Sequence, residues 1–83
     1  MKQYLVRHVC RYDKKQSCDK EFDTWEDAAS YYKKLLAKPL EERAESQLIN
    51  AIGVSTLYYR LPSVVKATGD SRYSYIQIMS IRK

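Results

Sequence analysis

The chain opens with a segment in which apolar and polar residues alternate. In QYLVRHVCRY, residues 3–12, one face carries Tyr4, Val6, His8, Cys10 and Tyr12, and the other carries Leu5, Arg7, Val9 and Arg11. A period of two residues is typical of a β-strand with one buried face. The polar run over residues 13–17 predicts a turn, and residues 18–23 predict a short returning strand.

The apolar spacing becomes helical after residue 23. Thr24 is a favoured N-cap residue, and Asp27 follows three positions later, as in a capping box. The apolar positions then recur every three to four residues, at Trp25, Ala28, Ala29, Tyr32, Leu35 and Leu36. Pro39 predicts the end of this helix and the start of a second helix over residues 40–52, with Gly53 as its C-terminal cap.

The β period returns after Gly53. We expect strands over residues 54–61, 63–68 and 72–82, separated by Pro62 and by a turn at residues 68–71. The expected order is therefore β(β)ααβββ. It predicts one α+β domain over residues 1–83, a two-layer sandwich with an antiparallel sheet of four to five strands and two helices on one face.

The last strand is predicted to have two different faces. By its period, Ile76 and Ile78 point toward the helices, whereas Tyr73, Tyr75 and Gln77 point outward. The same period exposes Met79 and Ile81, which predicts either a bulge after Gln77 or a partner that covers this end. As the final strand, residues 72–82 also predict a free sheet edge that could pair across a homodimer.

Charge is unevenly distributed along the 83 residues. The formal net charge is +5, with +4 in residues 1–18, −3 in residues 19–45 and +4 in residues 46–83. If the acidic segment forms the helical layer, the uncovered face of the sheet is open and basic. A basic face favours acidic partners, such as nucleic acid or an acidic protein surface.

Tyrosine is the second unusual feature, with eight residues in the chain. Tyrosine stacks on bases, while neighbouring cations hold phosphates. We therefore expect the open face to engage RNA or an RNA-associated host protein, although the tyrosines could instead pack in the core. The candidate binding residues are Arg7, Arg11, Tyr58, Arg60, Arg72, Tyr73, Tyr75 and Arg82.

Two resemblances bear on this expectation. In SRYSYIQI, residues 71–78, Tyr73, Tyr75 and Ile76 match the aromatic, aromatic and apolar positions of the first ribonucleoprotein motif of RNA-recognition-motif domains. The expected element order resembles that of RelE-type ribonuclease toxins, which would assign catalysis to Arg60, Arg72, Tyr73, Tyr75, Arg82 and Lys83. The only histidine, His8, shares an apolar face with Val6 and Cys10, so we interpret it as structural. We expect no enzyme and keep the toxin as an alternative.

A short, tyrosine-rich chain without a Gly-rich phosphate loop or a Ser–His–acid set also resembles the small accessory proteins of bacteriophages. That resemblance implies a stoichiometric inhibitor of a host nuclease or defence factor that acts by occlusion. A protein–protein inhibitor with no nucleic-acid contact is the alternative.

The cysteines carry little information about chemistry. Cys10 and Cys18 match no zinc spacing, and His8 cannot complete a four-ligand site, so no metal or cofactor is expected. The two thiols could pair across a hairpin. Because no secretory signal is visible, we expect reduced thiols and a cytoplasmic protein. No run of about 18 apolar residues is present, so no membrane contact is expected.

Overall fold

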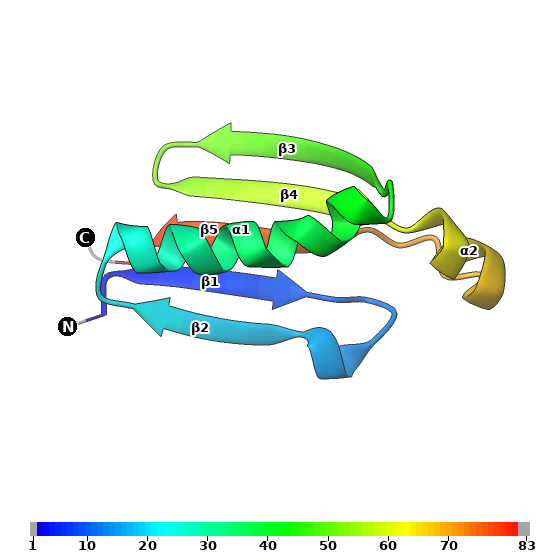
Figure 1. Cartoon of the computed structure of the whole chain (residues 1–83), viewed down its shortest axis with the longest axis horizontal. Helices are drawn as coiled ribbons and strands as arrows, with labels where there is room; N and C mark the ends of the chain where they lie inside the picture. Colours follow the sequence, from blue (N-terminus) through cyan, green and yellow to red (C-terminus); the bar gives the residue numbers. More distant parts are fainter. Residues whose placement is uncertain (1, 82–83) are drawn as a thin grey trace.

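One antiparallel sheet forms the framework of the computed structural model, which describes residues 2–81. Its strands are β1 (Tyr4–Val9), β2 (Cys18–Phe22), β3 (Glu45–Ala51), β4 (Val54–Arg60) and β5 (Ser74–Ser80), in the spatial order β2-β1-β5-β4-β3. The long helix α1 (Trp25–Glu41) covers one face of the sheet (Figure 1), and a 3-10 turn, η1 (Lys14–Gln16), links β1 to β2. The predicted α+β class and the antiparallel sheet are confirmed.

The core lies between α1 and the central strands. Because opposite residues of an antiparallel pair share a face, Val6, Leu57 and Ile76 all point toward α1. The buried cluster consists of Val6, Ala28, Tyr32, Tyr59, Leu61, Ile76 and Ile78. The prediction that Ile76 and Ile78 belong to the core is confirmed.

The start of α1 is the one predicted from the sequence. The Thr24 hydroxyl accepts a hydrogen bond from the Asp27 backbone N–H at 3.3 Å. Ala28 and Tyr32 face the sheet and are buried, whereas Trp25 is 50 % exposed and packs edge-on against Tyr4. The predicted apolar stripe is therefore correct except at its first member.

The predicted second helix over residues 40–52 is wrong. Pro39 stands in the last turn of α1, so the helix loses one hydrogen bond near its end and continues to Glu41. Arg43 then adopts a left-handed conformation with φ of 52°. The Ala44 N–H binds the Pro39 carbonyl at 2.9 Å and the Arg43 N–H binds the Leu40 carbonyl at 3.2 Å, which together form a Schellman motif. The chain reverses there and enters β3.

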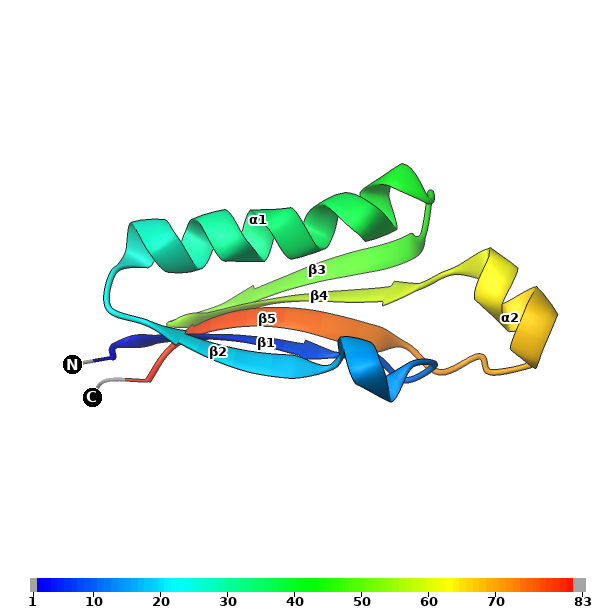
Figure 2. The same ribbon diagram turned by 60° about the horizontal axis from the view of Figure 1, so that its bottom comes forward.

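The predicted strand over residues 63–68 is also wrong. These residues form the short helix α2 (Pro62–Thr68), which begins with proline at its first position and ends at Gly69, whose φ is 75°. The Gly69 N–H binds the Val65 carbonyl at 2.8 Å. Figure 2 shows that α2 lies beyond the end of the sheet, so the structure does not have two helices on one face.

β5 is a central strand, because it pairs with β1 on one side and β4 on the other. The prediction that residues 72–82 form a free edge, and with it a homodimer through this strand, is therefore wrong. The register with β1 runs without interruption from Tyr75 to Ser80, so no bulge follows Gln77. Met79 lies half-buried on the uncovered face, opposite Leu5 and Val54.

Neither described helix has both the length and the apolar character that a bilayer-spanning helix needs.

Candidate functional site

The sheet face that points away from α1 is the candidate site, and we call it the open face. The strand registers place on it Asp19 and Glu21 from β2, Leu5, Arg7 and Val9 from β1, Tyr75, Gln77 and Met79 from β5, Val54, Thr56, Tyr58 and Arg60 from β4, and Glu45, Gln47, Ile49 and Ala51 from β3. Four of the eight residues expected to bind a partner, Arg7, Tyr58, Arg60 and Tyr75, therefore share one surface.

Aromatic contacts occupy one end of the open face. The rings of Tyr58 and Tyr75, directly opposite in the sheet, have centroids 5.8 Å apart at an angle of 52°. Tyr73 precedes β5, and its ring lies 4.7 Å from the Arg60 guanidinium. Tyr58 and Tyr73 are both exposed. The outward position of these tyrosines follows the predicted pattern, and their binding role stays a prediction.

The arginines of the open face are bound to carboxylates of their own sheet. The Arg7 guanidinium donates to both oxygens of Asp19, from Nε at 3.0 Å and from Nη2 at 3.2 Å. Arg60 donates to Glu45 Oε2, through Nε at 3.1 Å and also through Nη2. These contacts raise the pKa of both guanidinium groups, so both arginines stay charged and are neutralised locally.

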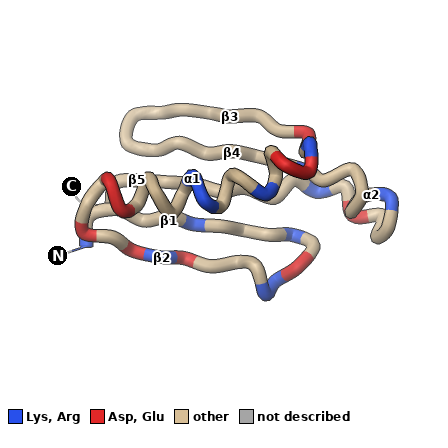
Figure 3. The backbone as a smooth tube through the Cα atoms, in the orientation of Figure 1, with Lys and Arg blue, Asp and Glu red and all other residues tan. Residues whose placement is uncertain are grey.

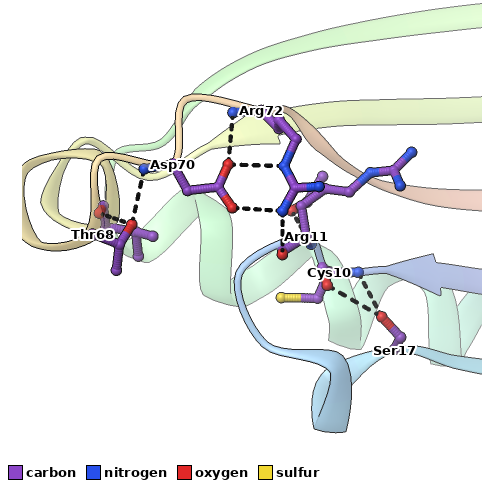
Figure 4. Close-up of polar contacts among 8 residues, drawn as sticks. Cys10, Arg11, Ser17, Thr68, Asp70 and Arg72 are labelled. Carbon is purple, nitrogen blue, oxygen red and sulfur yellow. Dashed lines mark hydrogen bonds and ion pairs between the residues drawn. The ribbon is translucent and has the colours of Figure 1, made fainter.

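Arg72 has the same arrangement in the loop before β5 (Figure 4). Its Nε and Nη2 donate to the two carboxylate oxygens of Asp70 at 3.0 and 2.8 Å. The bonds from Arg72 lower the pKa of the Asp70 carboxyl to about 2. Arg72 Nη2 also donates to the Arg11 carbonyl at 3.1 Å, which ties this loop to the one after β1. The guanidinium therefore holds two loops together.

The remaining two candidates contribute less to the open face. Arg11 is exposed in the loop that follows β1, where its backbone N–H donates to the Ser74 hydroxyl. Arg82, like Lys83, lies outside the described residues.

The open face is not basic, contrary to the prediction. It carries two arginines, Arg7 and Arg60, against the three carboxylates of Asp19, Glu21 and Glu45. No described lysine lies on the open face: Figure 3 shows lysines and arginines along η1, β2, α1 and α2, and the strand register turns the only lysine of β2, Lys20, toward the helix side. α1 carries three lysines and three carboxylates, so neither the open face nor α1 holds the net positive charge of the chain.

A second feature is a cavity of about 350 Å³ between the sheet and α1, lined among others by His8, Tyr12, Tyr59, Lys34 and Lys38. At its floor the Tyr59 hydroxyl and His8 Nε2 are 2.7 Å apart. Burial raises the pKa of Tyr59 and, to about 12, that of Tyr12, and burial lowers the pKa of His8. All three side chains are neutral at pH 7, and the interpretation of His8 as a satisfied core residue is confirmed.

The lowered pKa of His8 predicts a pH-dependent stability. Below its ordinary value of 6.5 the unfolded chain takes up a proton that the folded protein does not, so the free energy of unfolding should fall between about pH 6.5 and 5. Urea unfolding at pH 7.5 and pH 5 measures this. His8 is the only histidine, so a His8→Gln variant should lack this dependence. A wild-type protein that becomes more stable over this range would contradict the prediction.

Metal and thiol chemistry find little support in the described residues. Within residues 2–81 no three or more His, Cys, Asp and Glu side chains gather as a metal site would require. Cys10 is buried and Cys18 exposed, and both are free thiols. Cys18 Sγ lies 3.4 Å from the Tyr31 hydroxyl.

Sequence reasoning missed the three carboxylates that bind the arginines. The contact of Asp19 with Arg7 could have been predicted, because a hairpin closed by the turn at residues 13–17 places residue 19 opposite Arg7. The contact of Asp70 with Arg72 could also have been predicted, because the two residues are only two positions apart in the sequence. The contact of Glu45 with Arg60 could not have been predicted, because the segment that contains Glu45 was expected to be helical.

Comparisons with protein-family models, with curated proteins and with solved structures gave no match.

Proposed function

We propose that the chain is a non-catalytic protein-binding module whose open face covers a surface of a target protein. The observation that carries this proposal is that Arg7 and Arg60 are each held by a carboxylate of the same sheet, next to exposed tyrosines. What remains for a partner is a nearly neutral aromatic surface. Centres of protein interfaces are enriched in tyrosine, methionine and arginine and poor in unpaired charge.

The apolar end of the open face extends this surface. Leu5, which is buried, and the half-buried Met79 and Val54 lie side by side across three strands, beyond the hydrogen bond that Gln77 donates to Thr56 at 2.9 Å. An apolar patch on the same face as exposed tyrosines suits the centre of an interface that excludes water. Occlusion of a host nuclease or defence factor, the mode of action implied by the resemblance to phage accessory proteins, is the form of inhibition that such a face supports.

RNA binding is the second candidate, and it fits the other layer better. Phosphates attract cations that are free to exchange their counterions. Arg7 and Arg60 would first have to release Asp19 and Glu45, whereas Lys34 and Lys38 line the cavity beside α1 without a carboxylate bound to either among the described contacts. If the chain binds RNA, the affinity should therefore depend on these lysines and not on the open face.

The ribonuclease alternative has little to support it. A phosphodiester-cleaving site needs a proton acceptor and cations that meet at one accessible place. His8 is buried against Tyr59, and the guanidinium groups of Arg60 and Arg72 are bound to carboxylates. These side chains do not converge on a common cavity.

Affinity purification from the native cell tests the proposal. Wild-type protein is compared with a Tyr58→Ala/Tyr73→Ala variant and with a Lys34→Ala/Lys38→Ala variant, each with and without nuclease. We expect the same partner protein to be recovered with and without nuclease. The amount recovered should be at least ~10-fold lower with the tyrosine variant, because an aromatic hot spot contributes more than about 1–2 kcal/mol to binding. The lysine variant should recover it as the wild type does.

The other outcomes would overturn the proposal in distinguishable ways. RNA that is retained at low salt, lost at physiological salt and lost in the lysine variant would establish the nucleic-acid alternative. Cleavage of RNA by the purified chain would establish the toxin. Recovery that is equal for the wild type and the tyrosine variant would show that the open face is not the binding surface.

A further inference from the structure

β3 forms an edge of the sheet that no described part of the chain covers. All seven of its residues are exposed, and it pairs only with β4. α1 lies over β1, β5 and one end of β4 and leaves β3 uncovered (Figure 1). Leu48, on the α1 side of the sheet, is 55 % exposed, and Ile49, on the open face, is 47 % exposed.

The backbone of β3 presents unpaired groups along this edge. In an antiparallel ladder, alternate residues direct their N–H and C=O groups toward the partner strand and away from it. The two-residue turn at Ile52 and Gly53 closes on the Ala51–Val54 pair. Counted from that pair, the outward groups belong to Ser46, Leu48 and Asn50, which are free to pair with another strand.

The two edges of the sheet differ in how they are protected. β2 carries three charged residues in succession, Asp19, Lys20 and Glu21, which discourage pairing with a further strand. β3 has no charge and no proline between Ser46 and Ala51. An uncharged edge strand with two exposed aliphatic side chains, Leu48 and Ile49, is an aggregation hazard in a monomer unless another strand pairs with it.

We propose that two copies of the chain pair antiparallel through β3, around a two-fold axis at Leu48. This pairing joins the two five-stranded sheets into one continuous sheet. Leu48 lies opposite its own equivalent, Ser46 opposite Asn50 of the second copy, and Gln47 opposite Ile49. The outward N–H and C=O groups of each strand then bind those of the other.

The chemistry of the strand favours a second copy over another partner, because β3 is complementary to itself in this register. Two Leu48 side chains cover each other on the α1 side, and Ile49 packs on the stem of Gln47 on the open face. Glu45, the one charged residue of β3, falls opposite Ala51 and is already bound to Arg60. No like charges are opposed, which satisfies the requirement of an isologous interface.

The dimer would also double the open face. With strands about 4.8 Å apart and a rise of about 3.4 Å per residue, the two Tyr58 positions lie three strand spacings apart across the sheet and two residues apart along it, about 16 Å in all, on the same side of the sheet. The inference itself does not depend on the proposed function, because it concerns the edge of the sheet and not the target of its face.

Light scattering coupled to size-exclusion chromatography tests the register. Wild-type protein should have twice the 9.8 kDa mass of one chain. Leu48→Lys and Leu48→Glu should each be monomeric, because each places like charges face to face at the two-fold axis. A one-to-one mixture of these two variants should recover the doubled mass, since Lys and Glu then oppose each other.

Two further variants separate edge pairing from misfolding. Ser46→Pro removes an outward N–H and leaves the pairing of β3 with β4 intact, so it should be folded by circular dichroism and monomeric. Glu21→Lys, on the other edge, should stay dimeric. A wild type that is monomeric at about 100 µM, where a dimer with a micromolar Kd is populated, would overturn the inference, as would a dimeric Leu48→Lys or a mixture that stays monomeric. These masses are measured without a target, so they are independent of the proposed function.

Discussion

Replacing Ile76 by alanine is expected to lower the free energy of unfolding by about 2–5 kcal/mol, the cost of deleting a buried aliphatic side chain and leaving a cavity. Ile76 is fully buried at the middle of β5, paired with His8 on one side and Leu57 on the other. Neighbours on both strands and on α1 cannot all move into the space. Because small domains have a stability of roughly 5–15 kcal/mol, this loss should be visible as a large shift of the urea midpoint.

The matched control is the same substitution at Ile52. That side chain is fully exposed in the turn between β3 and β4. Ile52→Ala should change the free energy of unfolding by less than about 0.5 kcal/mol, as surface substitutions do. Equal effects at the two positions would show that β5 is not the central strand of the core.

The elements that sequence could predict are those in which local pattern and tertiary packing agree. The alternation in residues 3–12 and 72–82 predicted β1 and β5, and the cap at Thr24 with the stripe through Ala28 and Tyr32 predicted α1. In each of these elements the apolar residues that create the periodicity are also the residues that face the core. Ile76 and Ile78 were recognised for that reason.

The two wrong elements lack that agreement. β3 is exposed along its whole length, so burial imposed no alternation on it, and its leucine, isoleucine and alanine residues happened to fall at helical spacing. The stop signal was also unusual, because Arg43 occupies the left-handed position where glycine is favoured. α2 shows the opposite case, since its β-branched residues suggested a strand while Pro62 and Gly69 supplied helix ends.

The outward position of two tyrosines could be predicted from the sequence, whereas the charge of the open face could not. The period of β5 indicated that Tyr73 and Tyr75 point away from α1, and the structure places them there together with Tyr58. Summing charge over segments could not show that Arg7 and Arg60 are bound by Asp19 and Glu45, because those pairs are set by strand register. The difference between a basic and a neutral face depends on these pairs.

Two Tyr→Phe substitutions in the core should differ in their effect on stability, although the chemical change is identical. Tyr59→Phe removes the hydroxyl that is bound to His8 Nε2 at 2.7 Å. The imidazole is left buried without this partner, and the expected loss in the free energy of unfolding is about 1–3 kcal/mol. Tyr32→Phe removes a buried hydroxyl that has no hydrogen-bond partner among the described residues.

In the folded protein no hydrogen bond compensates for the desolvation of the Tyr32 hydroxyl. Tyr32→Phe should therefore leave the protein equally stable or stabilise it by up to ~1 kcal/mol. Urea unfolding at pH 7.5, where His8 is neutral, measures both variants under conditions that separate this effect from the titration of the imidazole. The sign is decided by the hydrogen-bond partner and not by burial, since both rings face the same core. A Tyr32→Phe variant as destabilised as Tyr59→Phe would mean that the Tyr32 hydroxyl has a partner in solution.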